Sequence, residues 1–368
     1  MLESVEVSNI ACFDEGFTKV DFKPLTILVG PNNAGKSTII NAINYIKDMI
    51  CSQSWQSRSA NLANLKDVVY AHDLTRHLII KVQFTFSSDQ SAKKLYRVYL
   101  DISPSQSMME VSDGGQATTT TNVSGLSIRY TGNALNELND ELLQKLWYIA
   151  PIRSQIARGV QLTGRIPPTQ PLEPNGSNLI QYYLRQFTDR NPKYREAEKW
   201  ITKIDPSINL VKTPFNVDAV SAELSSEVSL GKFRTNVNFA HMGMGIQNIA
   251  TIVGALIFSP DHSTLLIEEP ENHLHPAAQE ILVDLINYEV LNHSKQVIFT
   301  THSWDMVEPY FSDIGEGSER GKNHIIMEPD KFSIKTVKRI GGSSPKIEEF
   351  NLKRKYSDVR DGFKKLIG

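Results

Sequence analysis

Residues 30–37 read Gly-Pro-Asn-Asn-Ala-Gly-Lys-Ser, and they constrain the fold more than any other part of the chain. They fit the pattern G-x-x-x-x-G-K-[ST], in which a glycine-rich loop wraps around phosphate groups. An apolar run at 25–29 predicts a buried strand before the loop, and a periodic apolar pattern at 38–43 predicts a helix after it. A strand, a loop and a helix N-terminus direct backbone N–H groups and a helix dipole at one point, which suits a polyphosphate.

The chemistry of such a loop gives each residue type a task. Its glycines let the backbone wrap tightly where a Cβ would collide with phosphate. Lys36 can reach the β- and γ-phosphates as a point charge, Ser37 can offer its hydroxyl to Mg²⁺, and Thr38 can contact an inner phosphate. The alternative is a glycine turn before an ordinary helix, but the flanking strand and helix favour nucleotide binding. The predicted nucleotide-binding residues here are Gly30, Asn32, Asn33, Ala34, Gly35, Lys36, Ser37 and Thr38.

Composition narrows the choice of partners and compartment. The chain has 368 residues and a net charge of −2, so it lacks an overall basic signature for nucleic acid, although a local basic surface would not show in this total. Cys12 and Cys51 fit no metal or redox spacing and are expected to be reduced thiols. There is no apolar run of about 18 residues and no signal-like N-terminus, so we expect a cytoplasmic protein with no membrane contact.

A second motif combines a buried strand with acidic residues. Residues 264–276 read Thr-Leu-Leu-Ile-Glu-Glu-Pro-Glu-Asn-His-Leu-His-Pro. After a phosphate-binding loop, the first acid at such a strand end, Glu268, is predicted to support Mg²⁺, and Glu269 is predicted to be the general base for an attacking water. The alternative is that both acids cap the next helix through its dipole. His273 and His275 make a weak case for zinc, and we favour a loop that contacts a second subunit.

Two further segments complete an ordered set. Residues 296–303, Gln-Val-Ile-Phe-Thr-Thr-His-Ser, predict a buried strand that ends beside His302. A histidine at this place can contact a γ-phosphate and the attacking water, whereas a lone histidine would be read as packing at a turn. Gly243 and Gly245 precede an apolar helical pattern, so they mark another candidate helix N-terminus that faces phosphate.

The remaining patterns give a coarse outline. Residues 77–86 and 95–102 predict strands with one solvated face, and 103–126, rich in Ser, Thr, Gly and Asp, predict loop. Residues 134–147 predict a helix, and 147–153 a strand. No sustained heptad pattern appears. Other expected elements are helices at 177–204, 246–258 and 277–290, a polar β-like stretch up to about 239, and a charged, helical tail from 346.

Taken in order, these residues resemble the heads of ABC-type ATPases of the AAA family, above all the RecF/SMC-like group that includes the OLD family. The segments that carry the resemblance are 27–43, 148–153, 267–276 and 300–303, within a similarity that spans 1 to about 310. It implies an α/β fold, a P-loop NTPase of the ABC-ATPase type with a mixed central sheet, an antiparallel β subdomain and a helical lobe. We expect three parts: 1–150 with the P-loop and β insert, 151–260 as a mainly helical lobe, and 261–368 with the acidic motif, the histidine and a charged tail.

The resemblance also implies roles and cofactors. ATP and Mg²⁺ would be bound by Lys36 and Ser37 with Glu268, and Glu269, His302 and Lys36 would act in catalysis. Gly243 and Gly245 would contact ATP held by a second copy in an ATP-sandwich homodimer. Ala240 stands where the family's signature segment has serine, so one hydroxyl contact to phosphate would be lost.

The resemblance has limits that shape the functional prediction. The chain lacks a long coiled coil, and the stretch after His302 is expected to be too short for the nuclease domain of OLD nucleases. The leading hypothesis is therefore a Mg²⁺-dependent ATPase dimer that gates or scaffolds a separately encoded effector, a nuclease or toxin, in bacterial anti-phage defence. The alternative is a RecF-like, ATP-dependent DNA-binding clamp in repair. A scaffold that hardly hydrolyses ATP and a transporter subunit are less favoured.

Overall fold

The computed structural model has two compact units, which are described separately. The first comprises Met1–Leu146 and Glu328–Gly368, and the second comprises Trp147–Met327. The three-part division predicted from the sequence is retained as a prediction. The structure describes residues 1–52, 68–73, 75–86, 93–103, 107–115, 119–123, 126–151, 160–161, 172–206, 208–211, 221–222, 225–230, 233–311, 325, 327–339, 343–350 and 356–367. Ile152 and Arg153, at the end of a predicted strand, lie outside these ranges.

A seven-stranded sheet dominates the first unit, with the order β2-β1-β4-β5-β6-β8-β7. Its neighbouring strands are antiparallel except for the parallel pair β6 and β8. The strands are β1 (Leu2–Ser8), β2 (Thr18–Asp21), β4 (Leu78–Phe86), β5 (Lys94–Ile102), β6 (Ser107–Ser112), β7 (Thr119–Val123) and β8 (Leu126–Tyr130). Buried and half-buried residues alternate along β4, as expected for a sheet with one covered face.

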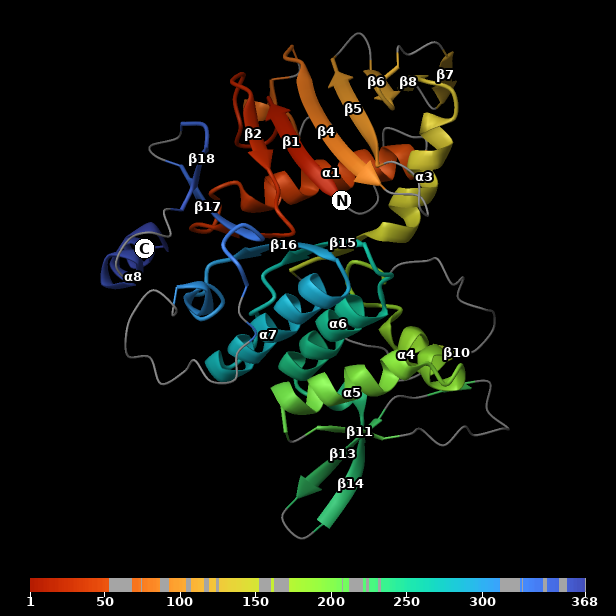
Figure 1. Ribbon diagram of the computed structural model, residues 1–368, viewed down its shortest axis with the longest axis vertical. Coiled ribbons are helices and arrows are strands. Elements are labelled where there is room, and N and C mark those ends of the chain that lie inside the picture. The colour runs from red at the N-terminus through yellow and green to blue at the C-terminus, as the bar shows by residue number, and fades with distance from the viewer. Residues whose placement is uncertain are drawn as a thin grey trace. The chain divides into compact units, whose positions relative to one another are not determined.

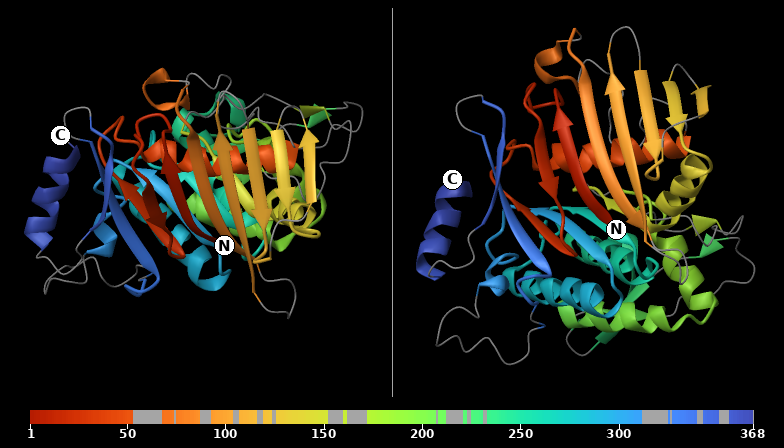
Figure 2. Two further views of the ribbon diagram at one scale, coloured as in Figure 1. Left: turned by 90° about the horizontal axis from the view of Figure 1, so that it is seen from above. Right: turned by 45° about the horizontal axis from the view of Figure 1, so that its top comes forward.

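Two helices cover this sheet. α1 (Lys36–Ser52) and α3 (Ala134–Lys145) pack on each other, α1 also packs on β1 and β4, and α3 packs on β6. Figure 1 shows both helices along one side of the strands, and Figure 2 shows the same strand order from two other directions. Leu135, Leu138 and Leu142 recur at helical spacing and form the buried stripe of α3.

The first unit also holds the strand that leads into the P-loop. β3 (Leu25–Val29) is buried at every residue and pairs in parallel with β17 (Phe332–Lys338). β17 pairs in antiparallel register with β18 (Lys346–Glu349), and α8 (Tyr356–Ile367) follows. Residues far apart in the sequence therefore build the support for the P-loop.

The second unit is mainly helical around a small group of buried strands. β15 (Thr264–Glu268) lies between β9 (Leu146–Ile149) and β16 (Gln296–Thr301), and it is parallel to β16. The helices are α4 (Leu179–Thr188), α5 (Pro192–Ile204), α6 (Met244–Phe258) and α7 (Pro276–Asn292). α5, α6 and α7 pack on one another, as Figure 1 shows. Short strands complete the unit: β10 (Val160–Gln161), β11 (Asn209–Val211), β12 (Ser221–Ala222), β13 (Ser225–Leu230) and β14 (Phe233–Asn238).

A buried ion pair lies in the core of the second unit. Lys295 Nζ is 2.7 Å from Glu289 Oε2, and both side chains are almost fully buried. Burial raises the pKa of Glu289 and lowers the pKa of Lys295, because each charge has left water. Lys295 also donates a hydrogen bond to the carbonyl oxygen of Leu256, which fixes the ammonium group between α6 and α7.

Several sequence predictions need correction. Residues 103–126 were expected to be loop, but the described part contains β6 and β7. Met109 and Val111 of β6 are buried, and the threonines of β7 are β-branched residues that can form a strand of a partly solvated sheet. The tail from 346 begins as β18 before it becomes α8, and β17 was not predicted. None of the helices that the structure describes is long and apolar enough to cross a membrane.

Candidate functional site

The P-loop in the first unit is tightly curled between β3 and α1. Asn33 and Gly35 have positive φ angles of 63° and 106°, so the backbone turns sharply just before the helix. Asn32, Asn33 and Ser37 are exposed, whereas Ala34 is buried beneath them. The side chains of Asn32, Asn33 and Ser37 thus face solvent, and the buried part of the loop lies beneath them.

The two glycines of the motif are needed for close packing. A Cβ on Gly30 would lie 2.3 Å from the carbonyl oxygen of Val337 at the end of β17, and one on Gly35 would lie 2.8 Å from Cys12 Sγ. Cys12 Sγ is also 3.7 Å from Thr38 Oγ1, and burial raises the pKa of the Cys12 thiol. Cys12 therefore packs beneath the P-loop as a neutral thiol.

Lys36 begins α1 and folds back over its own loop. Its ammonium group donates hydrogen bonds to the carbonyl oxygens of Gly30 at 2.7 Å and Pro31 at 2.9 Å, and the residue is 5% exposed. Those carbonyls hold the positive charge at the centre of the curled loop. This position suits a cation that balances a bound phosphate.

The acidic motif lies in the second unit at the end of β15. Glu268 is 2% exposed, and its Oε1 accepts a 2.7 Å hydrogen bond from the hydroxyl of Tyr148 in β9. Glu269 follows with a φ of 45°, a left-handed conformation that is uncommon outside glycine. Its N–H donates to the carbonyl oxygen of Thr300 at 3.1 Å, and its Oε2 accepts from Asn272 Nδ2 at 3.0 Å. Both the backbone and the carboxylate of Glu269 are therefore held in place.

Glu271 is a site residue for which the sequence predicted no role. It is 5% exposed, and its Oε1 accepts hydrogen bonds from Thr301 Oγ1 at 2.5 Å and from the backbone N–H of His302 at 3.0 Å. His302 Nδ1 lies 3.4 Å from Glu271 Oε1 and 3.9 Å from Glu269 Oε1. The only signal in the sequence was a third acid within four residues, since the contacts join segments about 30 positions apart.

The structure thus brings together part of the predicted set within each unit. Glu268, Glu269 and His302 all lie where the parallel strands β15 and β16 end; Glu269 is near His302, whereas Glu268 is bonded to Tyr148 of β9. In the first unit, the loop residues from Gly30 to Thr38 form one curled segment. The assignment of both groups to one ATP molecule stays a prediction, as does the role of each residue.

The predicted signature segment forms the start of α6. Gly243 is the exposed N-cap, and a Cβ there would meet nothing within 4 Å. A Cβ on Gly245 would instead lie 2.6 Å from the carbonyl oxygen of His273. Asn248 Nδ2 also donates to the carbonyl oxygen of Asn272 at 2.5 Å, so α6 is packed directly against the loop that carries the acidic motif.

The histidines next to the acidic motif have structural positions. His273 has a φ of 64° and is exposed, and His275 caps α7 by accepting a hydrogen bond from the N–H of Ala277. Among the described residues, the group of acids and histidines with ligand atoms within 4.8 Å of one another is Glu196, Glu289 and His293. Lys295 already supplies a positive charge to this group, so we assign no metal to it.

Two family models of AAA ATPases match parts of the chain. Residues 1–111 match the family model described as "AAA ATPase domain", and residues 149–305 match the one described as "AAA domain, putative AbiEii toxin, Type IV TA system". The chain is 26% identical to an OLD nuclease of Thermus scotoductus, over 93% of this chain and 68% of that protein. It is 24% identical to an ATP/GTP phosphatase of Helicobacter pylori, over 91% of this chain and 94% of that one.

Solved structures with a similar fold are SMC heads. The SMC head bound to the C-terminal winged-helix domain of ScpA has a TM-score of 0.60 at 15% identity, over 95% of this chain and 98% of that one. A head with a coiled coil and joint from Pyrococcus yayanosii has a TM-score of 0.57 at 11% identity, over 98% and 99%. These likenesses show the fold, and they confirm the predicted α/β P-loop NTPase class. The family models and the relatives show an enzyme that hydrolyses ATP, and the chain resembles ATPase heads of the SMC and OLD-like kind.

Proposed function

We propose that the chain is an ATP-operated switch in which two copies clamp around ATP and open after hydrolysis. In this proposal Lys36 and its loop bind the triphosphate, and Glu269 and His302 direct water at the γ-phosphate. The observation that carries the proposal is the left-handed backbone of Glu269, which is held by Thr300 while Asn272 holds its carboxylate. A residue in this conformation costs about 1–3 kcal/mol, and such strain is concentrated at functional sites.

ATP binding would use contacts that the P-loop now makes to itself. The ammonium group of Lys36 would exchange its two carbonyl partners for phosphate oxygens. The first N–H groups of α1 have no partner within the helix, so they are suited to a second set of phosphate contacts. Gly30 and Gly35 keep the loop closed against Val337 and Cys12, and a larger residue at either would open it.

Ser37 and Glu268 are the residues that would hold Mg²⁺. A serine hydroxyl and a carboxylate are hard oxygen ligands of the kind that Mg²⁺ prefers. Ser37 is exposed at the start of α1, and Glu268 is buried with Oε1 oriented by Tyr148, so their chemistry and positions within each unit fit the ion. When bound, Mg²⁺ neutralises charge on the phosphates.

Hydrolysis would depend on the fixed carboxylate of Glu269. Asn272 donates to Oε2, which leaves Oε1, the oxygen on the His302 side, to accept a proton from water. Glu271 accepts hydrogen bonds from the backbone N–H of His302 and the hydroxyl of Thr301, so the backbone that carries the imidazole is held in place. His302 is 40% exposed in its side chain, which leaves its ring accessible to a γ-phosphate.

The second copy would be engaged through the start of α6. Gly243 is exposed at a helix N-terminus, where backbone N–H groups and the dipole favour an anion. We assign Gly243 and Gly245 to contact with ATP bound by the partner copy. With Ala240 in place of serine, this contact rests on the backbone alone, so we expect weak dimers and slow turnover.

The switch is proposed to act on a separate effector, a nuclease or toxin, in bacterial defence against phage. The supporting facts are that one relative is a nuclease of the OLD type and that the family model over 149–305 bears the name of a toxin. The chain would control the effector in an ATP-dependent way, and the effector would carry out the nuclease or toxin activity. In this proposal the ATPase dimer and its effector form a complex in the cytoplasm.

Purified variants test this proposal. Lys36→Ala should abolish ATP hydrolysis, and Glu269→Gln should retain ATP binding and accumulate a dimer that size-exclusion chromatography with light scattering can detect. Glu280→Gln, an acid on α7 outside both motifs, is the matched control and should behave as wild type. Normal hydrolysis by Lys36→Ala would show that the assignment of the site is wrong, and a monomer in every nucleotide state would refute the clamp.

A further inference from the structure

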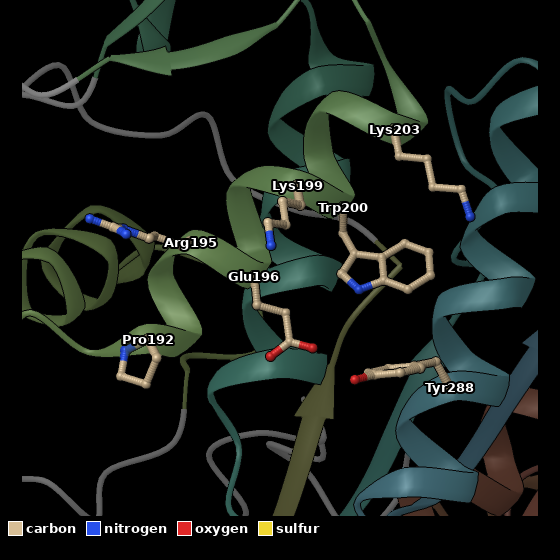
Figure 3. A pocket seen from close by; sticks show the side chains of 7 residues that line it. All are labelled: Pro192, Arg195, Glu196, Lys199, Trp200, Lys203 and Tyr288. Carbon is tan, nitrogen blue, oxygen red and sulfur yellow. The ribbon is translucent and has the colours of Figure 1, made fainter.

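A separate pocket lies on the outer face of α5 in the second unit. Its volume is about 610 Å³, within the usual range for small-molecule sites. The lining residues are Pro192, Arg195, Glu196, Lys199, Trp200, Lys203 and Tyr288, and Figure 3 shows them from close by. The P-loop, the acidic motif and His302 contribute nothing to this lining, so the pocket is distinct from the residues assigned to ATP hydrolysis.

The sequence of α5 explains why these side chains face outward. Asn191 caps the helix by accepting from the N–H of Lys193, and Pro192 occupies its first turn. The buried stripe consists of Tyr194, Ala197, Ile201 and Ile204, which repeat at helical spacing and anchor the helix to the unit. The opposite side carries the lining residues of α5, which recur one helical turn apart at 192, 195–196, 199–200 and 203, and Tyr288 is contributed by α7.

The pocket has a net positive charge although the chain is acidic overall. Arg195, Lys199 and Lys203 carry three positive charges and Glu196 carries one negative charge, which gives +2 here against −2 for the whole chain. Within the described part of the chain, Arg195 and Lys199 have no ion pair, whereas Lys203 has a long contact of 3.9 Å to Asp284. Cations without partners on an exposed helix face are available for an anion.

Two aromatic rings line the pocket. Trp200 and Tyr288 have ring centroids 5.9 Å apart and planes inclined at 51°, and Lys203 Nζ lies 4.7 Å from the centre of the Trp200 ring. Figure 3 shows the hydroxyl of Tyr288 directed at the carboxylate of Glu196. The two groups hydrogen-bond, and burial together with the negative charge of Glu196 raises the pKa of Tyr288.

We propose that this pocket binds a nucleotide, with its base against Trp200 and Tyr288 and its phosphate on Lys199 and Lys203. Aromatic rings stack on bases, and the ammonium groups match a phosphate. The carboxylate of Glu196 can accept a hydrogen bond from the amino group of cytosine or adenine. An acidic peptide would also match the cations and rings, but its carboxylate side chains offer no donor to the carboxylate of Glu196, whereas the amino group of a base does, so the complete set of groups favours a nucleotide. The site would serve either a free mononucleotide or a nucleotide within a single strand, and it does not depend on the proposed clamp.

Calorimetric titration of the chain of 368 residues tests the proposal and separates a free mononucleotide from a nucleotide within a strand. The Lys36→Ala background removes the P-loop as a competing site. The ligands are CMP, UMP, a dC oligonucleotide and a hexaglutamate peptide with one tryptophan. We expect CMP or the oligonucleotide to bind, with Lys199→Glu weakening binding by about 10-fold or more and Trp200→Ala by about 10-fold. Lys364→Glu, a charge reversal on an exposed residue of α8, should leave the affinity unchanged.

The pattern of binding decides the outcome. Binding of CMP assigns the pocket to a mononucleotide, and binding of the oligonucleotide alone assigns it to a strand. Glu196→Gln should reduce the preference for CMP over UMP, which a residue with only a structural role would not do. The proposal is overturned if none of the nucleotide ligands binds at millimolar concentration, if Lys199→Glu and Trp200→Ala bind as the parent does, or if the acidic peptide alone binds at this pocket.

Discussion

The two glycines at the start of α6 offer a sharp test of how this segment is built, because they lie two positions apart in different surroundings. At Gly245 an added Cβ would be 2.6 Å from the carbonyl oxygen of His273, and relief to an ordinary contact of 3.4 Å requires a movement of about 0.8 Å. The obstacle is backbone, so rotation of a side chain cannot relieve it. At Gly243 the same Cβ would meet nothing within 4 Å.

We therefore expect Gly245→Ala to lower the free energy of unfolding by about 1–3 kcal/mol, the usual cost of overpacking. Gly243→Ala should change it by less than about 1 kcal/mol, because only an N-cap preference is altered. Urea unfolding followed by circular dichroism measures both values, with wild type as reference. Equal effects of the two substitutions would refute the packing of α6 against the acidic-motif loop.

The same pair separates folding from function. If Gly243 contacts the ATP of a second copy, Gly243→Ala should reduce ATP-dependent dimerisation while unfolding stays near wild type. Analytical ultracentrifugation with ATP, in a Glu269→Gln background that preserves bound ATP, provides the readout. A dimer of undiminished affinity in Gly243→Ala would remove Gly243 from the proposed interface.

Three further substitutions test other contacts. Glu271→Gln should lower kcat for ATP hydrolysis about 10-fold or more with a small change in KM, because Thr301 and His302 at the end of β16 lose their charged hydrogen-bond acceptor. An unchanged kcat would exclude a positioning role for Glu271. Tyr148→Phe should raise the Mg²⁺ concentration needed for half-maximal activity, since Glu268 loses an orienting donor; equal Mg²⁺ titrations would contradict this. Glu289→Gln should destabilise the protein by about 3–5 kcal/mol by leaving Lys295 unpaired, whereas Glu289→Leu combined with Lys295→Met should recover most of that loss in thermal unfolding.

The parts of the fold that the sequence predicted are those specified by local pattern. The P-loop has fixed spacing between a strand and a helix, and the buried strands β15 and β16 are short apolar runs followed by polar residues. Such segments carry their own signal because nearly every side chain faces the core. The helices α3 and α6 were predicted from the same kind of evidence.

The parts that escaped prediction depend on distant partners. β17 has alternating apolar and polar residues after a long unpatterned stretch, and it is fixed by parallel pairing with β3, about 300 positions earlier in the chain. β7 consists largely of threonine, which in isolation resembles a loop but gains a partner in β8. Strand pairing of this kind is a tertiary property that periodicity does not reveal.

The same distinction applies to the candidate site. Glu268, Glu269 and His302 were identified because each follows a predicted strand, and the geometry within the second unit places them together. The left-handed backbone of Glu269 and the contacts of Glu271 to Thr301 and His302 had no sequence signal, because they arise only when the ends of β15 and β16 meet. The strongest sites for mutagenesis therefore include one residue that the motif alone would not select.

The central claim is that Lys36 and Glu269 act on one ATP molecule, the first in binding and the second in hydrolysis. Single-turnover measurement with excess enzyme tests it directly, because binding and phosphate release are recorded separately. We predict that Lys36→Ala fails to bind ATP. Glu269→Gln should bind ATP with wild-type affinity and should release phosphate at least about 100-fold more slowly than wild type. Wild-type phosphate release by Glu269→Gln, or tight ATP binding and hydrolysis by Lys36→Ala, would contradict the account.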